Sequence, residues 1–206
     1  MTFYDFHNRF RAFGCFSWGQ VQAWRPDFAR GNIVRWVASG RLLRLRRGVY
    51  AFPDALDVPG MGQVVATRLY PPCYLSLQWV LARRELIPES VVAYTCVTSR
   101  KTASFRNDFG SFEYRSVRDD LMFGYVPEPT HDGKLHSFVA TTEKAILDLL
   151  YLEPQYDSES AIAELRIDGD VVGDGFDWTR FDDFLARFRC LSLERRARLF
   201  KKEFRP

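Results

Sequence analysis

The sequence predicts an α+β protein with an N-terminal winged helix-turn-helix followed by a C-terminal α+β domain. Two observations carry this prediction. Residues 27–53 read as one helix followed by one tight hairpin, the arrangement of a recognition helix and its wing. From residue 91 onward, β-rich runs and amphipathic helices favour a small, mostly antiparallel sheet with several helices. We expect domains at residues 1–55, the head, and 56–206, the body.

The head is expected to contain three helices, at about residues 5–13, 18–24 and 28–39. Ser17 and Asp27 stand where an N-cap side chain can accept free backbone N–H groups of the second and third helices. Gly40 can take the left-handed conformation that ends the third helix. The short corner between the second and third helices is the spacing of a helix-turn-helix.

The third helix has two different sides. At about 100° per residue, Ile33 and Trp36 fall on one side, which we expect to pack inward. Gly31, Arg35 and Ser39 fall on the other side, which is small, polar and cationic. Such a side can enter the major groove of DNA.

The wing is predicted from a two-residue alternation. Leu43 and Leu45 alternate with Arg44 and Arg46, as in a strand that is buried on one side only, and Gly48 supplies the turn. We therefore expect the arginines on the outer face of the hairpin, with Arg47 at its tip.

Charge is segregated along the chain. Residues 1–53 hold nine arginines, no lysine and two aspartates, which gives +7, whereas the whole chain carries +3. A cationic head on a mildly acidic body is what polyanion binding by one domain requires. The alternative is an arginine-rich solvated surface, but the arginines cluster on the third helix and the wing.

Seven residues of the head are predicted to contact double-stranded DNA: Arg30, Asn32, Arg35, Ser39, Arg44, Arg46 and Arg47. On the third helix, arginine pairs with guanine and asparagine with adenine in the major groove. The wing arginines would contact phosphates or the minor groove. Arg30 has an alternative role, with its stem lying over the core, and the wing arginines could simply keep the hairpin soluble.

In the body, a hairpin is expected over residues 101–117 and a further strand over 121–126. Ser76 and Thr141 are expected to cap helices at 77–85 and 141–150. Arg100 and Lys101 either contact a partner or RNA, or protect a sheet edge from pairing. The basic residues of the last helix either bind nucleic acid or form a solvated face.

No catalytic, cofactor or metal site is predicted. Asp168-Gly169-Asp170 lies in a glycine-rich loop, Asp119 and Asp120 are adjacent and would point to opposite faces of a strand, and the cysteines show no Cys-x-x-Cys spacing. His136 near Glu143 is more simply a surface histidine than an acid–base pair. The chain has no apolar run of about 18 residues, so we expect a cytoplasmic protein without a membrane partner.

Three stretches resemble the AbiEi-type antitoxins, the transcriptional regulators of type IV toxin–antitoxin modules in phage defence. They are the hairpin at 40–50, the run at 87–115 that includes Val97-Thr98-Ser99-Arg100-Lys101-Thr102, and the helix Ala-Thr-Thr-Glu-Lys-Ala-Ile-Leu-Asp-Leu-Leu at 140–150. Together they span about residues 16–152. Thr142 stands where the family often has proline, and the last fifty residues match only as generic helices.

The resemblance implies a DNA-binding head that represses its own operon. It also implies a body that counteracts a nucleotidyltransferase-like toxin encoded beside it, with or without direct contact. Two other function classes stay open. A winged-helix enzyme that processes nucleic acid would need a polar cleft with converging carboxylates or histidines, and a ligand-sensing regulator would need a roomy apolar pocket.

Overall fold

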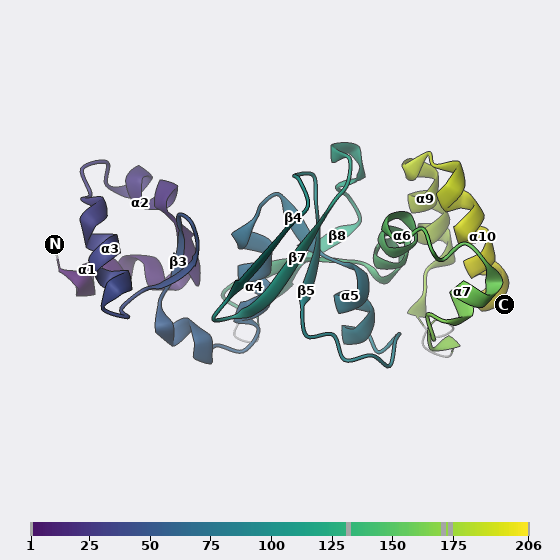
Figure 1. Cartoon of the computed structure of the whole chain (residues 1–206), viewed down its shortest axis with the longest axis horizontal. Coiled ribbons are helices and arrows are strands. Elements are labelled where there is room, and N and C mark those ends of the chain that lie inside the picture. Colours follow the sequence, from purple (N-terminus) through teal and green to yellow (C-terminus); the bar gives the residue numbers. More distant parts are fainter. Residues whose placement is uncertain (1, 131–132, 170–171, 173–174, 206) are drawn as a thin grey trace.

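A computed structural model describes residues 2–130, 133–169, 172 and 175–205 of the chain. The molecule is elongated, with the head at one end, a six-stranded sheet in the middle and a group of helices at the other end (Figure 1). The N-terminus lies at the head end and the C-terminus at the opposite end. The α+β class is confirmed at this level.

The head combines three helices with a three-stranded antiparallel sheet in the strand order β1-β3-β2. Its elements in chain order are α1 (Phe3–Phe10), a 3₁₀ helix (Arg11–Phe13), β1 (Cys15–Ser17), α2 (Trp18–Trp24), α3 (Arg30–Ala38), β2 (Leu43–Arg46) and β3 (Val49–Ala51). The second helix has the predicted bounds. Strand β1 was not predicted, because three residues are too few to show a period.

The two predicted caps of the head differ in outcome. Ser17 accepts the N–H of Gln20 at 3.2 Å, and the Gln20 side chain accepts the N–H of Ser17 in return, so this cap is confirmed. Asp27 does not cap α3; it pairs with Arg25 at 3.1 Å. The helix starts later because the Phe28 N–H donates to the Arg25 carbonyl, which continues the turn while the Phe28 ring enters the core.

The two faces of the head sheet pack in opposite directions. Phe16, Tyr50 and Phe52 face the helices of the head, where they join an aromatic core around Phe6. The residues that alternate with them, including Cys15, Val49 and Ala51, are buried in the core of the body. The head sheet is therefore a partition between two hydrophobic cores.

The body is built around the sheet β6-β7-β5-β4-β9-β8, in which three of the five described pairings are antiparallel and two are parallel. Its strands are β4 (Cys73–Leu75), β5 (Tyr94–Thr98), β6 (Ala103–Asn107), β7 (Gly110–Ser116), β8 (Tyr125–Pro129) and β9 (His136–Ala140). The predicted hairpin at 101–117 is confirmed as β6–β7. The strand expected at 121–126 begins only at Tyr125, after a 3₁₀ helix at Asp119–Leu121.

Some helices pack against the sheet, and others lie beyond it on the side away from the head (Figure 1). In chain order they are a 3₁₀ helix (Pro53–Asp57), α4 (Met61–Leu69), α5 (Leu77–Arg83), α6 (Thr142–Leu152), α7 (Glu159–Ala163), α9 (Trp178–Phe188) and α10 (Leu191–Phe204). The Thr141 cap of α6 is confirmed by its bond from the Lys144 N–H at 3.3 Å. The central strand β4 was missed, because its three buried residues follow a Tyr-Pro-Pro run that reads as a break.

A fully buried polar cluster ties α6 to β4. The Asp148 carboxylate accepts hydrogen bonds from Tyr74 Oη at 2.9 Å and Ser76 Oγ at 2.8 Å, and it forms an ion pair with Lys144. The Ser76 hydroxyl therefore does not cap α5 as predicted. Burial lowers the pKa of Lys144, while the neighbouring Asp148 opposes that shift.

Candidate nucleic-acid interface

The outer side of α3 is exposed, and most of its side chains are small. Gly31, Ala38 and Ser39 are small and exposed, and the exposed Arg35 stands among them. Val34 shares this side and is 63% exposed. The helical wheel that places Gly31 outward also places Val34 outward, so this residue was missed although the sequence carried the signal. A helix with small outward residues can approach a DNA groove closely.

Asn32 and Arg35 contact each other on this side. The guanidinium of Arg35 donates a hydrogen bond to Asn32 Oδ1, one helical turn away. Asn32 is half-buried and Arg35 is exposed, so the amide orients the terminal guanidinium of a side chain on the exposed side of the helix. The geometry gives Asn32 an orienting role toward Arg35, and its contact with a base stays a prediction.

Arg30 and Ser39 lie at opposite ends of α3. The guanidinium carbon of Arg30 lies 5.6 Å from the centre of the Trp18 ring, so its side chain reaches back over α2. The Ser39 hydroxyl donates to the carbonyl of Trp36 at 3.3 Å. Both residues are exposed, and these contacts fix their side chains at the two edges of the outer side.

The β2–β3 hairpin, which is the predicted wing, follows the predicted alternation only as far as Leu45. Arg44 pairs with Tyr50, but Arg46 pairs with Val49, so the register shifts between Arg44 and Arg46 at a β-bulge. A bulge resets the alternation of side chains. Arg44 and Arg47 are exposed as expected, whereas Arg46 turns to the body side of the hairpin. The expectation that Arg46 stands on the outer face is therefore wrong.

Arg46 attaches the wing to the body. Its guanidinium carbon lies 5.7 Å from the ring centres of both Tyr70 and Phe105, and its buried Nε makes no hydrogen bond with any described residue. Beside it, the Asn107 amide donates to the Leu45 carbonyl at 3.3 Å. These contacts bring strand β2 of the head alongside β6 at the edge of the body sheet.

Arg100 also lies against Tyr70, the ring that Arg46 contacts. Its guanidinium carbon lies 4.5 Å from the centre of the Tyr70 ring, and it donates to the Pro71 carbonyl at 3.3 Å. Arg100 and Lys101 precede the edge strand β6 and are exposed, as is Arg106 within it. The cationic surface of the wing thus continues onto this edge, a neighbourhood that the sequence could not reveal because the residues are some sixty positions apart.

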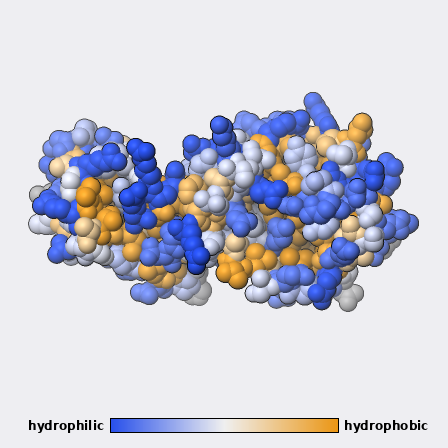
Figure 2. Space-filling model, in the orientation of Figure 1, coloured by the Kyte–Doolittle hydropathy of each residue, from blue (hydrophilic) through white to orange (hydrophobic). Residues whose placement is uncertain are grey.

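The arginine side chains of the head are mostly exposed to solvent. Of its nine arginines, all within the described residues, every one except Arg46 is exposed. Figure 2 shows strongly hydrophilic side chains standing out from the head toward the notch that separates it from the body. Asp27, the only acidic residue near α3 in sequence, is engaged by Arg25. The remaining positive field is what attracts a polyanion.

The last helix, α10, is different. Lys201 and Arg205 both pair with Asp182, Lys202 pairs with Glu159, and Arg195 pairs with Asp157. Arg196 is buried and donates to the carbonyls of Ser192 and Glu153. Since these cations are matched by carboxylates or carbonyls of the chain itself, the arrangement favours a structural role for the helix.

The carboxylates and histidines considered for catalysis do not converge. Asp119 and Asp120 are exposed in a 3₁₀ helix, and Asp120 pairs with Arg118. Glu143 is buried and accepts the Asp177 N–H, whereas His136 is exposed at the start of β9. Asp170 lies outside the described residues, and among those described no group of three or more His, Cys, Asp or Glu could hold a metal ion.

In the comparisons with known proteins, the chain matches no family model and no curated protein sequence. The resemblance to AbiEi-type antitoxins therefore rests on its three sequence stretches. Within the described part of the chain, none of the helices combines the length and the apolar character needed to cross a bilayer.

Proposed function

We propose that the protein binds double-stranded DNA through the outer side of α3 and the β2–β3 hairpin, with the head acting as a winged helix-turn-helix. The observation that carries this proposal is the exposure of a small, arginine-bearing helix side together with eight of the nine head arginines. The element order α1-β1-α2-α3-β2-β3 and the strand order β1-β3-β2 are those expected of a winged helix. In this arrangement Arg35 reads a base edge, and Arg44 and Arg47 contact phosphates.

We further propose that this binding represses the protein's own operon and that the body counteracts a co-encoded nucleotidyltransferase-like toxin. This part of the proposal is supported by the resemblance of residues 16–152 to AbiEi-type antitoxins. The test is binding of the full-length chain to the duplex upstream of its own gene, against a scrambled duplex, across a salt series. Selective binding supports the autorepressor, and equal binding to both duplexes rejects it.

Arg35→Ala is expected to reduce the preference for the operator over scrambled DNA. An arginine that contacts a guanine edge contributes about 1–3 kcal/mol of discrimination, and scrambled DNA lacks the matching base. The measurement is the ratio of the two dissociation constants at one salt concentration. Arg9→Ala, an exposed arginine on α1, serves as the control and should leave the ratio unchanged. Equal losses on both duplexes for Arg35→Ala would remove α3 from base reading.

Arg44→Ala and Arg46→Ala are expected to differ, although the residues are only two positions apart. If about five arginines meet phosphates, log K should fall with log salt at a slope of roughly −4 to −5, and removal of one contact should reduce the slope by about 1. We expect that reduction for Arg44→Ala, which is exposed, and none for Arg46→Ala, which stacks on Tyr70 and Phe105. A reduced slope for Arg46→Ala alone would show that the bulged side of the wing faces DNA.

A further inference from the structure

A cavity of about 400 Å³ lies where the head meets the body. It is lined by Arg11, Ala12, Gly14, Phe52, Asp54, Ala55, Val58, Met61, Lys134 and Leu135. The lining comes from three segments of the chain: the 3₁₀ helix after α1 with Gly14, the segment 52–61 that holds the 3₁₀ linker and the start of α4, and Lys134 and Leu135 just before β9. Its volume lies in the range of about 300–1,000 Å³ typical of small-molecule sites.

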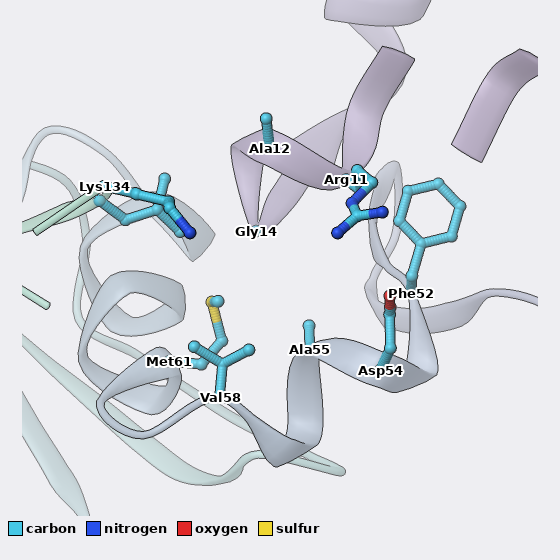
Figure 3. Close-up of a pocket in the computed structure, with 10 residues that line it drawn as sticks. Arg11, Ala12, Gly14, Phe52, Asp54, Ala55, Val58, Met61 and Lys134 are labelled. Carbon is cyan, nitrogen blue, oxygen red and sulfur yellow. The ribbon is translucent and has the colours of Figure 1, made fainter. Parts of the chain in front are cut away.

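The cavity has an apolar floor and cationic sides. Ala55, Val58 and Met61 form the floor in Figure 3, with Arg11 on one side and Lys134 on the other. The Arg11 side chain forms no hydrogen bond or ion pair with a described residue. Asp54, the carboxylate at the rim, lies 3.2 Å from Nε2 of His7. Arg11 therefore offers its N–H donors to an anionic group, above a surface that favours an apolar group.

The cavity cannot be closed by moving the head closer to the body, because the two already meet beside it. A Cβ added to Gly14, whose φ is +69°, would stand 2.8 Å from Met61 Sδ and 2.9 Å from the Leu135 side chain. Head and body are therefore in contact at Gly14, next to the cavity. Because the lining belongs to both sides, a molecule in the cavity contacts head, linker and body together.

We propose that this cavity binds a small amphipathic carboxylate, with its apolar part over Met61 and Val58 and its anionic group at Arg11. A ligand that bridges both sides changes the free energy of their relative arrangement, and it therefore changes the affinity of the head for DNA. This second step rests on the proposed DNA-binding function. The first step, ligand binding, does not depend on it.

The binding experiment uses the full-length chain without DNA. The fluorescent probe 1-anilinonaphthalene-8-sulfonate is expected to bind, and decanoate is expected to displace it more effectively than decylamine, which has the same chain length and the opposite charge. Arg11→Glu should weaken decanoate binding by roughly tenfold or more, since it replaces a charge-assisted hydrogen bond by repulsion. Arg9→Glu makes the same charge change on α1, outside the cavity lining, and should leave binding unchanged.

Equal displacement by decylamine, or equal weakening by the two glutamate variants, would overturn the proposal, as would absence of probe binding. Decanoate should also raise the melting temperature of the wild-type chain, because a ligand of the folded state stabilises it, and should do so less for Arg11→Glu. The coupling is tested by DNA affinity with and without decanoate. Decanoate binding that leaves DNA affinity unchanged would reject the regulatory step alone, whereas failure of DNA binding itself would reject the proposed function and leave the ligand site standing.

Discussion

Asp148→Ala should cost about 3–5 kcal/mol of the free energy of unfolding, because it leaves the Lys144 ammonium buried without its counter-ion. Neither side chain has measurable exposure, so water cannot replace the missing carboxylate. Tyr74 and Ser76 would also lose the acceptor of their hydroxyl groups. Since a domain is stable by about 5–15 kcal/mol, this is a large part of the total.

Urea unfolding of wild type and variant measures this loss. Asp157→Ala is the matched control, because Asp157 pairs with Arg195 at 3.8 Å in a position where both side chains are exposed, and its removal should have a small effect. The double variant Lys144→Met with Asp148→Leu removes the buried charges together and should recover the part of the loss that comes from the uncompensated ammonium, while Tyr74 and Ser76 still lack their acceptor. If Asp148→Ala were as mild as Asp157→Ala, the buried ion pair would not be maintaining the attachment of α6 to β4.

The sequence predicted the local features of this fold well, because they depend on neighbouring residues. The bounds of α2, the Ser17 and Thr141 caps and the β6–β7 hairpin all follow from short patterns. Strand β4 was missed for the same reason, since three buried residues carry no pattern. The role of Ser76 depends on Asp148, seventy-two positions away, and no local pattern reveals it.

In the candidate site too, the sequence predicted what depends on neighbouring residues and missed what depends on distant ones. The exposed side of α3 follows from helical periodicity, and Val34 could have been placed on it. Arg46 was misplaced because a single bulged residue reverses the alternation, and the aromatic rings that receive its guanidinium come from α4's end and β6. The cavity could not be predicted, because its lining exists only once head, linker and body are assembled.

Phe6→Ala should destabilise the head by about 3–5 kcal/mol, the usual loss for a buried phenylalanine. Phe6 is fully buried, and its ring lies within 6.3 Å of six other aromatic rings of the head, those of Phe10, Phe16, Trp24, Phe28, Trp36 and Phe52. None of these residues belongs to the buried core of the body. The loss should therefore be concentrated in α1, α2 and α3, and with them the proposed DNA binding should fall.

Amide hydrogen exchange measures this distribution directly, because protection reports the local free energy of opening. We expect Phe6→Ala to lower protection in α1–α3 strongly, in β3 moderately and in α6 little, since one face of β3 remains against the body core. Tyr4→Ala, on the same helix at a side chain that is 71% exposed, is the control. If α6 lost as much protection as α3, the two cores would open as one unit, and the division at residue 55 would not describe how the protein unfolds. Protection that is lost only in the head would show that the sheet between the cores is also the boundary between two cooperative units, and the proposed DNA binding could then be tested with a core substitution that leaves the body intact.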